Sequence, residues 1–522
     1  MAIKSLFRSA SRSPKATSRN HAGGAAYKLD SRTALAQLAA TGCFGSTFYV
    51  SGVEQLDTVL EHAKNCDPSY VAKVAVYARR KGFMKDMPAV LLAHLATRGP
   101  DGLAAMKAAF PLVIDNGRML RNFVQVLRSG QLGRKSLGTA PKKAVQRWLA
   151  SRSAMQLFRD SVGNDPSLVD IVKMVHPKPS SDAQRAMYGY LLGKAHDAEQ
   201  LPQPVRLFEA WKRGGDSHEV PKVPSRMLQG LPLTEAAWTA IARNAGWHET
   251  RMNLNTFSRH GVFKDQAMVD LVASRLADKG EVQRARAFPY QLLSAWKAAS
   301  SAPASIQEAL QDAMEHAVAN VPSIEGRVVI CPDVSGSMRG PVTGYRAGAT
   351  THVRCVDVAG LIAAAMLRKN RSARVLPFEH SVRSIRLNPR DSVMSIATAL
   401  AAIGGGGTSC SAPLAQLNKE RAKVDAVIYV SDNESWVDRE GRNGWGGGTA
   451  MMTEWTKLRK RSPKAKLVCI DLTPNAQSQA IDRPDILNVG GFSDAVFDVV
   501  AQFVAAEGGA HWATLIEGVE LS

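Results

Sequence analysis

The chain has 522 residues, 45% hydrophobic and 21% charged, which is the composition of an ordinary soluble globular protein. This length exceeds what one hydrophobic core supports, so we expect two to four domains. No run of about 18 apolar residues occurs, which excludes a membrane-spanning helix, and the net charge of +20 favours a polyanionic partner.

The N-terminal stretch is basic. Residues 1–29 hold six Lys or Arg and no acid, and they lack the apolar segment of a secretory signal. We expect residues 1–19 to form a disordered basic arm, with a transit peptide as the alternative. The six cysteines include no C-x-x-C pair, which argues against a disulfide framework or a zinc cluster and favours a reducing, cytoplasmic location.

From about residue 50 to 320, apolar residues recur at i, i+3 and i+4, the spacing of one helix face. Short joints carrying Pro, Gly or Asp separate these segments. Many medium helices without a strict repeat predict an irregular α-solenoid. The clearest predicted helices are 53–65, 69–80, 87–98, 122–130, 142–152, 167–175, 183–195 and 264–278.

Basic residues are concentrated in this helical part. Residues 1–322 carry 43 Lys or Arg against 26 Asp or Glu, whereas residues 323–522 carry 23 against 20. Between Asp115 and Asp160 there are ten basic residues and no acid. A solvated surface with an accidental bias is the alternative, but a run this long favours contact with a polyanion.

Near Pro322 the pattern changes to strands alternating with helices. We expect strands at 327–333, 372–379, 425–435 and 465–472, and helices at 356–370, 392–404, 411–423, 449–461 and 493–506. This alternation predicts a doubly wound, parallel α/β sheet. Ligands of such sheets bind where loops leave the carboxyl ends of the strands.

Three segments with oxygen ligands follow these strands or precede these helices. The motif DVSGS offers Asp333, Ser335 and Ser337, a run of four glycines precedes Thr408, and Asp432 ends the next apolar strand. One carboxylate and two hydroxyls in five positions suit a hard cation such as Mg²⁺. The sequence therefore predicts a divalent-metal site, most simply for Mg²⁺, at Asp333, Ser335, Ser337, Thr408 and Asp432.

Three enzyme classes fit this pattern less well. A serine hydrolase needs G-x-S-x-G, and the window around Ser335 lacks the first glycine. A phosphatase with an aspartyl nucleophile places a second Asp where this chain has Ser335. A phosphate-binding loop needs Gly-Lys-Ser/Thr, and GGGGTS has no Lys.

The metal-ligand set resembles the metal-ion-dependent adhesion site of von Willebrand factor A domains. That resemblance implies that the metal serves binding and leaves one position open for an acidic group of a protein ligand. Further motifs resemble the TROVE module of Ro autoantigen proteins: NHAGG (20–24), CFGSTFY (43–49), KKAV (142–145) with Trp148, VHPKPSS (175–181), AFPYQLL (287–293), GGT (406–408) and DNE (432–434).

The resemblance implies a ring of HEAT-like helical repeats at residues 20–322, followed by a von Willebrand factor A domain at residues 323–522. Its expected role is an RNA-binding scaffold and not an enzyme. Proteins of this family bind small noncoding Y RNAs on the ring's outer face and single-stranded 3′ ends of misfolded RNAs in the hole. They serve RNA quality control with exoribonuclease partners. The first alternative is a metal-dependent protein-assembly adaptor, and the second is an enzyme of phosphoryl transfer.

The same resemblance selects the candidate RNA contacts. For His176 the structural alternative is a helix C-terminal cap, and for the Lys and Arg residues it is a solvated helix face. The candidates are His176 and Lys178, then Lys142, Lys143 and Arg147, and with less support Arg134, Arg159 and Lys173.

Overall fold

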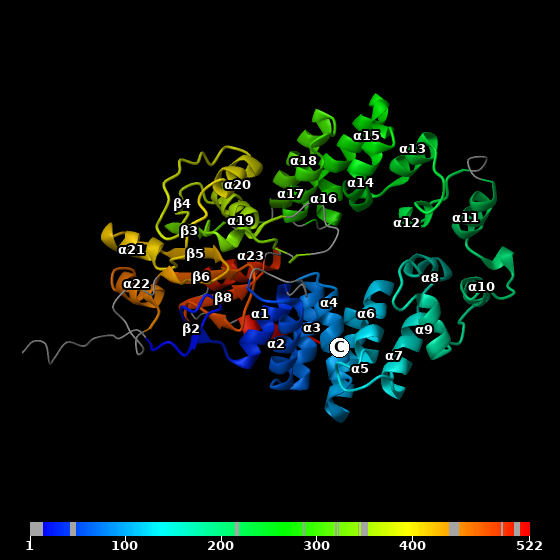
Figure 1. Ribbon diagram of the computed structural model, residues 1–522, viewed down its shortest axis with the longest axis horizontal. Helices are drawn as coiled ribbons and strands as arrows, with labels where there is room; N and C mark the ends of the chain where they lie inside the picture. The colour runs from blue at the N-terminus through cyan, green and yellow to red at the C-terminus, as the bar shows by residue number, and fades with distance from the viewer. Residues whose placement is uncertain are drawn as a thin grey trace, which may run out of the picture. The chain divides into compact units, whose positions relative to one another are not determined.

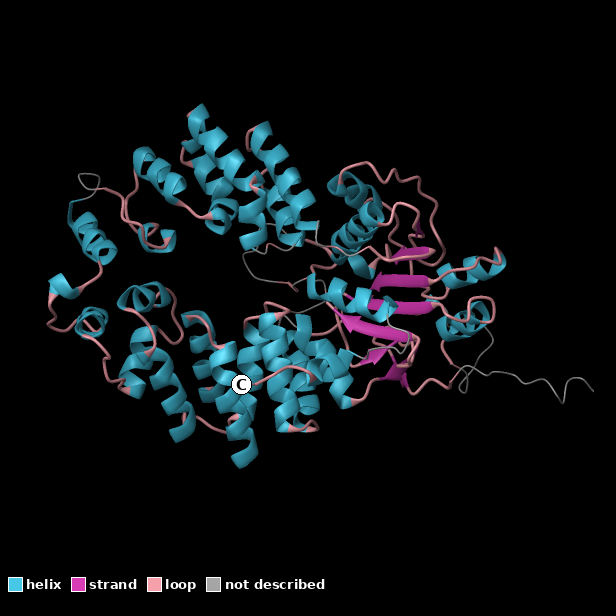
Figure 2. Cartoon of the chain, turned by 180° about the vertical axis from the view of Figure 1, so that it is seen from behind, coloured by secondary structure: helices cyan, strands magenta, loops and turns pink. Residues whose placement is uncertain are grey.

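The computed structural model describes residues 14–41, 49–214, 219–285, 287, 289–318, 321, 323–342, 344–345, 353–437, 448–491, 494–505 and 512–521. The predicted motif residues 43–48 and Phe288 lie outside these ranges, as does Pro322. Contacts divide the chain into two units. The first joins the described residues up to Asn65 with those of Val318–Gly518, and the second contains Cys66–Ala317. All described strands, magenta in Figure 2, belong to the first unit.

The first unit contains a five-stranded parallel sheet in the order β4-β3-β5-β6-β8. Because the neighbouring strands are parallel, their carboxyl ends share one edge. This confirms the predicted doubly wound sheet and adds β8, which the sequence pattern did not single out. The strands are β3 (Val328–Pro332), β4 (Arg374–Val375), β5 (Ala426–Ser431), β6 (Lys466–Asp471) and β8 (Ile486–Gly490).

Helices cover both faces of this sheet, as its continuous apolar strands require. Val427 and Tyr429 of β5 enter a core with Met452 and Trp455 of α22. On the other face, α19 packs against β3 and β5, and α20 packs on α19. The helices are α19 (Cys355–Lys369), α20 (Val393–Ala401), α21 (Ala412–Lys419), α22 (Ala450–Arg459), α23 (Asp494–Ala505) and α24 (Trp512–Glu517). Figure 1 shows α21 and α22 side by side.

The N-terminal segment packs on this α/β unit. Strand β1 (Ser18–Arg19) pairs with β2 (Ala25–Lys28), and β2 pairs with β7 (Gln477–Ser478). Helices α1 (Ser31–Thr41) and α2 (Gly52–Lys64) follow. The expectation of a disordered arm therefore differs from the structure at residues 14–19, which are placed and include β1. Residues 20–65 also group with the α/β unit and not with the helical one.

One buried asparagine fixes this segment. Asn20 Nδ2 donates to the carbonyl of Ser435 at 2.7 Å, and its Oδ1 accepts from the amide of Gly24 at 2.6 Å. A Cβ at Gly24 would lie 2.0 Å from the Ser435 carbonyl oxygen, so only glycine fits there without a backbone shift. Next to this turn, His21 Nδ1 lies 3.0 Å from Glu434 Oε1, and this hydrogen bond raises the pKa of His21.

The second unit is helical throughout its described residues, as predicted. Many helices pack against the helix two positions later in the chain. Examples are α3 on α5, α5 on α7 and α7 on α9. This is the packing of a stacked helical repeat and confirms the solenoid-like prediction. The first half comprises α3 (Pro68–Arg80), α4 (Asp86–Leu95), α5 (Gly99–Val113), α6 (Gly117–Arg128), α7 (Thr139–Ala150), α8 (Ala154–Asp160), α9 (Leu168–Val175) and α10 (Asp182–Leu191).

In the second half of this unit, α13 packs on α15 and α16 packs on α18, whereas α14 and α15 pack on the third helix onward, α17 and α18. Its helices are α11 (Gln203–Gly214), α12 (Ser225–Leu228), α13 (Glu235–Asn244), α14 (Trp247–Arg259), α15 (Gln266–Ala277), α16 (Lys279–Ala285), α17 (Pro289–Ala298) and α18 (Ala304–Ala317). Among the described residues, no helix has the length and apolar character needed to span a bilayer.

The Asn20 contacts generate a stability prediction. Asn20→Ala removes the hydrogen bonds of its side chain to the buried Ser435 carbonyl and the Gly24 amide, so the free energy of unfolding of the α/β unit falls by about 1–3 kcal/mol. Urea denaturation, together with hydrogen exchange of the β2 amides, measures this loss. Lys28→Ala, which removes an exposed side chain of the same strand, is the control. Equal midpoints for the two variants would contradict the assignment.

Candidate metal centre and nucleic-acid interface

The carboxyl edge of the sheet brings the predicted metal ligands together. The amide of Asp333, just after β3, donates to the carbonyl of Val430 at 2.9 Å, which ties this loop to the end of β5. The amide of Gly336 donates to the carbonyl of Gly406 at 2.8 Å. A Cβ at Gly336 would lie 3.1 Å from the Gly405 carbonyl oxygen, so the glycines allow the two loops to approach closely.

The predicted ligands share hydrogen bonds around Asp333. Its Oδ1 accepts from the amide of Ser335 at 2.8 Å, and its Oδ2 accepts from the hydroxyl of Ser431 at 2.6 Å. The hydroxyls of Ser335 and Ser337 lie 3.3 Å apart, and Ser337 also hydrogen-bonds the carboxylate of Asp432. Four of the five predicted ligands therefore form one cluster, and all four are buried.

The electrostatics of this cluster suit a cation. Burial, opposed by hydrogen bonds from Ser335 and Ser431, raises the pKa of Asp333 to about 6. Burial and the negative charge of Asp333 raise the pKa of Asp432 to about 7. Two buried carboxylates that each disfavour the other's ionisation gain from a divalent cation between them. The donor set, two carboxylates and at least two hydroxyls, is the hard oxygen set that Mg²⁺ prefers.

Thr408 joins this edge through its backbone. Its carbonyl accepts from the amides of Trp436 and Val437, both at 3.1 Å, so the glycine loop is tied to the loop after β5. The side chain is buried, and its hydroxyl stays a predicted ligand. The described residues hold no group of three or more His, Cys, Asp or Glu able to bind a metal, so a cation here depends on serine and threonine hydroxyls.

Three more polar residues at this edge were not predicted as parts of the site. Asp471, the last residue of β6, is buried with Oδ2 unpartnered among the described residues, and burial raises its pKa well above the ordinary value. Glu379 Oε2 accepts from the amides of Gly405 and Gly406 at 3.1 and 2.8 Å. The sequence did carry a signal for Asp471, because it ends a predicted strand as Asp432 does.

Tyr49 is the third of these residues. Its hydroxyl hydrogen-bonds Ser337, and its pKa is raised by burial and by the carboxylate of Asp432. The Tyr49 ring stacks at 6.4 Å from the ring of His21. Tyr49 lies more than 280 residues from the metal-site motif in sequence, so no local pattern could place it there.

The candidate RNA contacts gather around α7 and the end of α9. Lys143 and Arg147 are exposed one helical turn apart on α7, and Lys142 beside them is half-buried. Gln146 Nε2 donates to the carbonyl of Val175 at 2.6 Å, which holds the end of α9 against α7.

At that end, the backbone of His176 caps α9 in the left-handed conformation, with φ 51°, and its amide donates to the carbonyl of Val172. The alternative of a helix cap is therefore true of its backbone, while its side chain is exposed. Lys173 and Lys178 are exposed on either side of this cap.

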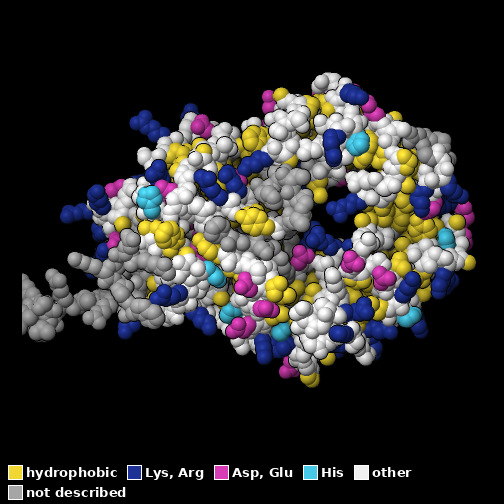
Figure 3. Space-filling model, in the orientation of Figure 1, with side chains coloured by type: hydrophobic (Ala, Val, Ile, Leu, Met, Phe, Trp, Pro, Cys, Tyr) yellow, Lys and Arg dark blue, Asp and Glu magenta, His cyan; other side chains and the backbone are white. Residues whose placement is uncertain are grey.

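The cations of this surface are available to a ligand. Within the described part of the chain, no ion pair or hydrogen bond holds the side chains of Lys142, Lys143, Arg147, Lys173 and Lys178. Some other exposed cations of the helical unit are paired, such as Arg185 with Asp182 at 2.8 Å and Arg206 with Glu199 at 2.6 Å. Figure 3 shows Lys and Arg side chains, dark blue, at the surface of this helical unit.

Arg134 and Arg159 differ from the other candidates. Arg134 donates to the carbonyls of Ser136 and Leu137, each at 2.8 Å, and to that of Ala96 at 3.2 Å. These bonds occupy its guanidinium and give it a structural role in the loop before α7. Arg159 is exposed and lines a separate cavity of about 750 Å³ with residues of α12–α14.

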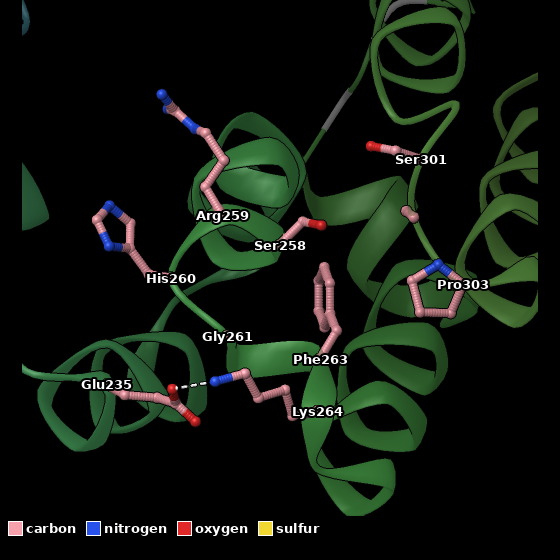
Figure 4. A pocket seen from close by; sticks show the side chains of 10 residues that line it. Glu235, Ser258, Arg259, His260, Gly261, Phe263, Lys264, Ser301 and Pro303 are labelled. Carbon is pink, nitrogen blue, oxygen red and sulfur yellow. Dashed lines mark hydrogen bonds and ion pairs between the residues drawn. The ribbon is translucent and has the colours of Figure 1, made fainter.

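A further hollow lies between α13, α14 and the start of α18, with a volume of about 670 Å³. Figure 4 shows Phe263 and Lys264 at this hollow, with Lys264 joined to Glu235. Their ion pair, at 2.6 Å, neutralises one cation, and the carboxylate opposes binding of an anion. This hollow is therefore a weaker anion site than the α7 surface.

Comparisons with known proteins agree with this arrangement. The family model of the Ro60 vWA domain matches residues 327–504. The RNA-binding protein RO60 of Deinococcus radiodurans is 27% identical over 526 aligned positions, which cover 94% of this chain and 95% of that protein. The RNA-binding protein RO60 of Caenorhabditis elegans is 23% identical over 257 residues, 47% of this chain and 38% of that protein.

The fold itself matches a solved structure. The crystal structure of the Deinococcus radiodurans RO (RSR) protein aligns with a TM-score of 0.64 and 23% identity, covering 91% of this chain and 99% of that one. The similarity to the Deinococcus radiodurans protein thus extends over nearly the whole chain and includes both the helical unit and the unit that carries the candidate metal site. The chain is therefore similar to Ro proteins over nearly its whole length, and its residues 327–504 match the Ro60 vWA domain.

Proposed function

We propose that this chain is a noncatalytic RNA-binding scaffold that holds RNA phosphates on the α7–α9 surface. The observation that carries the proposal is the set of unpaired cations on that surface, Lys142, Lys143, Arg147, Lys173 and Lys178. Lys and Arg without carboxylate partners neutralise phosphates and release counterions. The names of the two RO60 relatives, both RNA-binding proteins, support the same ligand class.

The finer role follows the family resemblance. We infer that a small noncoding Y-like RNA binds the basic surface, that single-stranded 3′ ends of misfolded RNAs enter a ring formed by the helical repeats, and that an exoribonuclease acts with the complex in cytoplasmic RNA quality control. The cationic surface supports the first part, because structured RNA is recognised mainly through its backbone and shape.

The vWA site has a separate role in this proposal. The cluster around Asp333 and Asp432 holds Mg²⁺, with an open position for a carboxylate of a protein ligand. This binding, taken alone, is the alternative function of a metal-dependent assembly adaptor. The buried carboxylates with raised pKa values favour it, and RNA binding that depends on salt separates the two functions.

The RNA proposal predicts the effect of removing the charges. Replacing Lys142, Lys143 and His176 together by Ala weakens binding of a hairpin with a 3′ tail by about tenfold or more at low salt. The plot of the logarithm of the RNA-binding constant against the logarithm of the salt concentration also becomes less steep, by about 1.5, because two phosphate contacts are lost. Fluorescence anisotropy over a series of salt concentrations measures both quantities.

Matched controls distinguish this effect from a general loss of charge. Replacing Arg185 and Arg206 by Ala removes two exposed cations of the same unit that already pair with carboxylates, and leaves affinity and slope near the wild-type values. Arg134→Ala lowers stability, since its donors hold backbone carbonyls. Unchanged affinity and slope in the triple variant would refute the assignment of the α7–α9 surface.

The metal proposal predicts stabilisation by Mg²⁺. At a Mg²⁺ concentration of 100 times Kd, binding stabilises the folded protein by about 2.7 kcal/mol and raises Tm by a few degrees. Asp333→Ala abolishes this shift and the calorimetric binding signal, and leaves RNA affinity within about threefold.

Asp425→Ala is the matched control, because Asp425 precedes β5 at the opposite end of the strand and pairs with Arg327. It keeps the Mg²⁺ response. Loss of the response in both variants would show that the Asp333 site is not specific. Equal loss of Mg²⁺ and RNA binding in Asp333→Ala would contradict independent sites.

A further inference from the structure

A cavity lies beside the cationic face of α7. It measures about 750 Å³, within the range of about 300–1,000 Å³ typical of small-ligand sites, and α5 and α7 supply most of its wall. The residues that matter here are Phe110, Ile114, Lys143, Arg147, Trp148 and Arg152.

Arg152 gives this cavity a planar wall. Its guanidinium carbon lies 4.1 Å from the centroid of the Trp148 ring. Trp148 is itself fixed, since its Nε1 donates to the carbonyl of Ile114 at 2.7 Å, and Arg152 Nη2 donates to the carbonyl of Asp115 at 2.7 Å. One face of the guanidinium is therefore covered by the indole of Trp148, a residue that is only 6% exposed, and Arg152 also lines the cavity.

The charges around the cavity favour an anion. Lys107, Lys143 and Arg147 are exposed at its rim. The carboxylate among the lining residues, Asp115, is already engaged, because Arg79 Nε donates to its Oδ2 at 3.0 Å and Asn116 donates to its Oδ1 at 2.6 Å. A ligand that joins a planar apolar group to a phosphate fits both the planar wall at Arg152 and the cations at the rim.

We propose that this cavity binds one unpaired nucleotide, with its base against the guanidinium of Arg152 and its phosphate at Lys143 and Arg147. Bases of single-stranded RNA stack on arginine planes and aromatic rings, and Phe110 and Ile114 complete an apolar wall. Lys143 and Arg147 belong to the α7–α9 surface as well, so an RNA strand on that surface reaches the cavity without a break in the charge. The inference rests on the proposed RNA-binding function and adds contact with a base.

The test compares two probes of equal charge, a ten-residue oligoadenylate and the same backbone with abasic residues. Stacking of one base is worth about 1–3 kcal/mol, so wild-type protein binds the oligoadenylate about fivefold or more tighter. Arg152→Lys keeps the charge and removes the plane. Ala140→Trp fills the cavity from its rim and leaves every cation in place.

Both variants are expected to reduce the affinity ratio to below about three, while affinity for the abasic chain stays at the wild-type value. Ser136→Trp, which adds the same bulk to the neighbouring cavity of about 510 Å³, keeps the wild-type ratio. Thermal melts confirm that each variant is folded. Since Ala140→Trp spares the Arg152 contacts, it decides the outcome if Arg152→Lys unfolds.

Two results would overturn the inference alone. One is an unchanged ratio in both variants. The other is binding of an acidic aromatic peptide, such as Glu-Trp-Glu-Glu, in the cavity while the affinity ratio of the oligoadenylate to the abasic chain stays unchanged. The base would then bind elsewhere. Failure of wild-type protein to bind either probe at low salt would overturn the RNA-binding function as well, so the two failures are distinguishable.

Discussion

Burial of carboxylates at one edge of a parallel sheet governs the architecture of the α/β unit. Asp333, Asp432 and Asp471 end or follow β3, β5 and β6, and the parallel register brings all three to the same edge. Buried charges of like sign are costly unless donors or cations compensate them. Seryl hydroxyls and loop amides supply part of this compensation here.

The organisation of this edge was largely predictable from sequence. Alternating strands and helices define a parallel sheet, and the sheet defines a common edge, so Asp333 and Asp432 could be placed together without coordinates. Asp471 obeys the same rule and could have been found. Tyr49 and the Asn20 turn could not, because their contacts join segments several hundred residues apart and leave no local pattern.

The helical unit shows a different limit of sequence reasoning. The periodic apolar positions predicted its helices, and the acid-free run between Asp115 and Asp160 predicted a cationic surface. Composition alone does not show which Lys and Arg side chains bind other groups of the protein. The guanidinium of Arg134 donates hydrogen bonds to backbone carbonyls, whereas no hydrogen bond is found for the side chains of Lys143 and Arg147 among the described residues. Only the fold distinguishes these cations. The Trp148–Arg152 stack likewise depends on how α7 ends against α5.

The turn at Asn20 also has a consequence for biosynthesis. Asn20 emerges from the ribosome 415 residues before Ser435, the residue whose carbonyl it binds. At about 5–20 residues per second, roughly 20–80 s pass between the two. Strand β2 has no partner β7 during that interval, while the helices of Cys66–Ala317 are already complete. Strand β1 can pair with one edge of β2 at once, but the edge of β2 that receives β7 is among the last to be paired, and until then a nascent chain must keep that edge from pairing elsewhere.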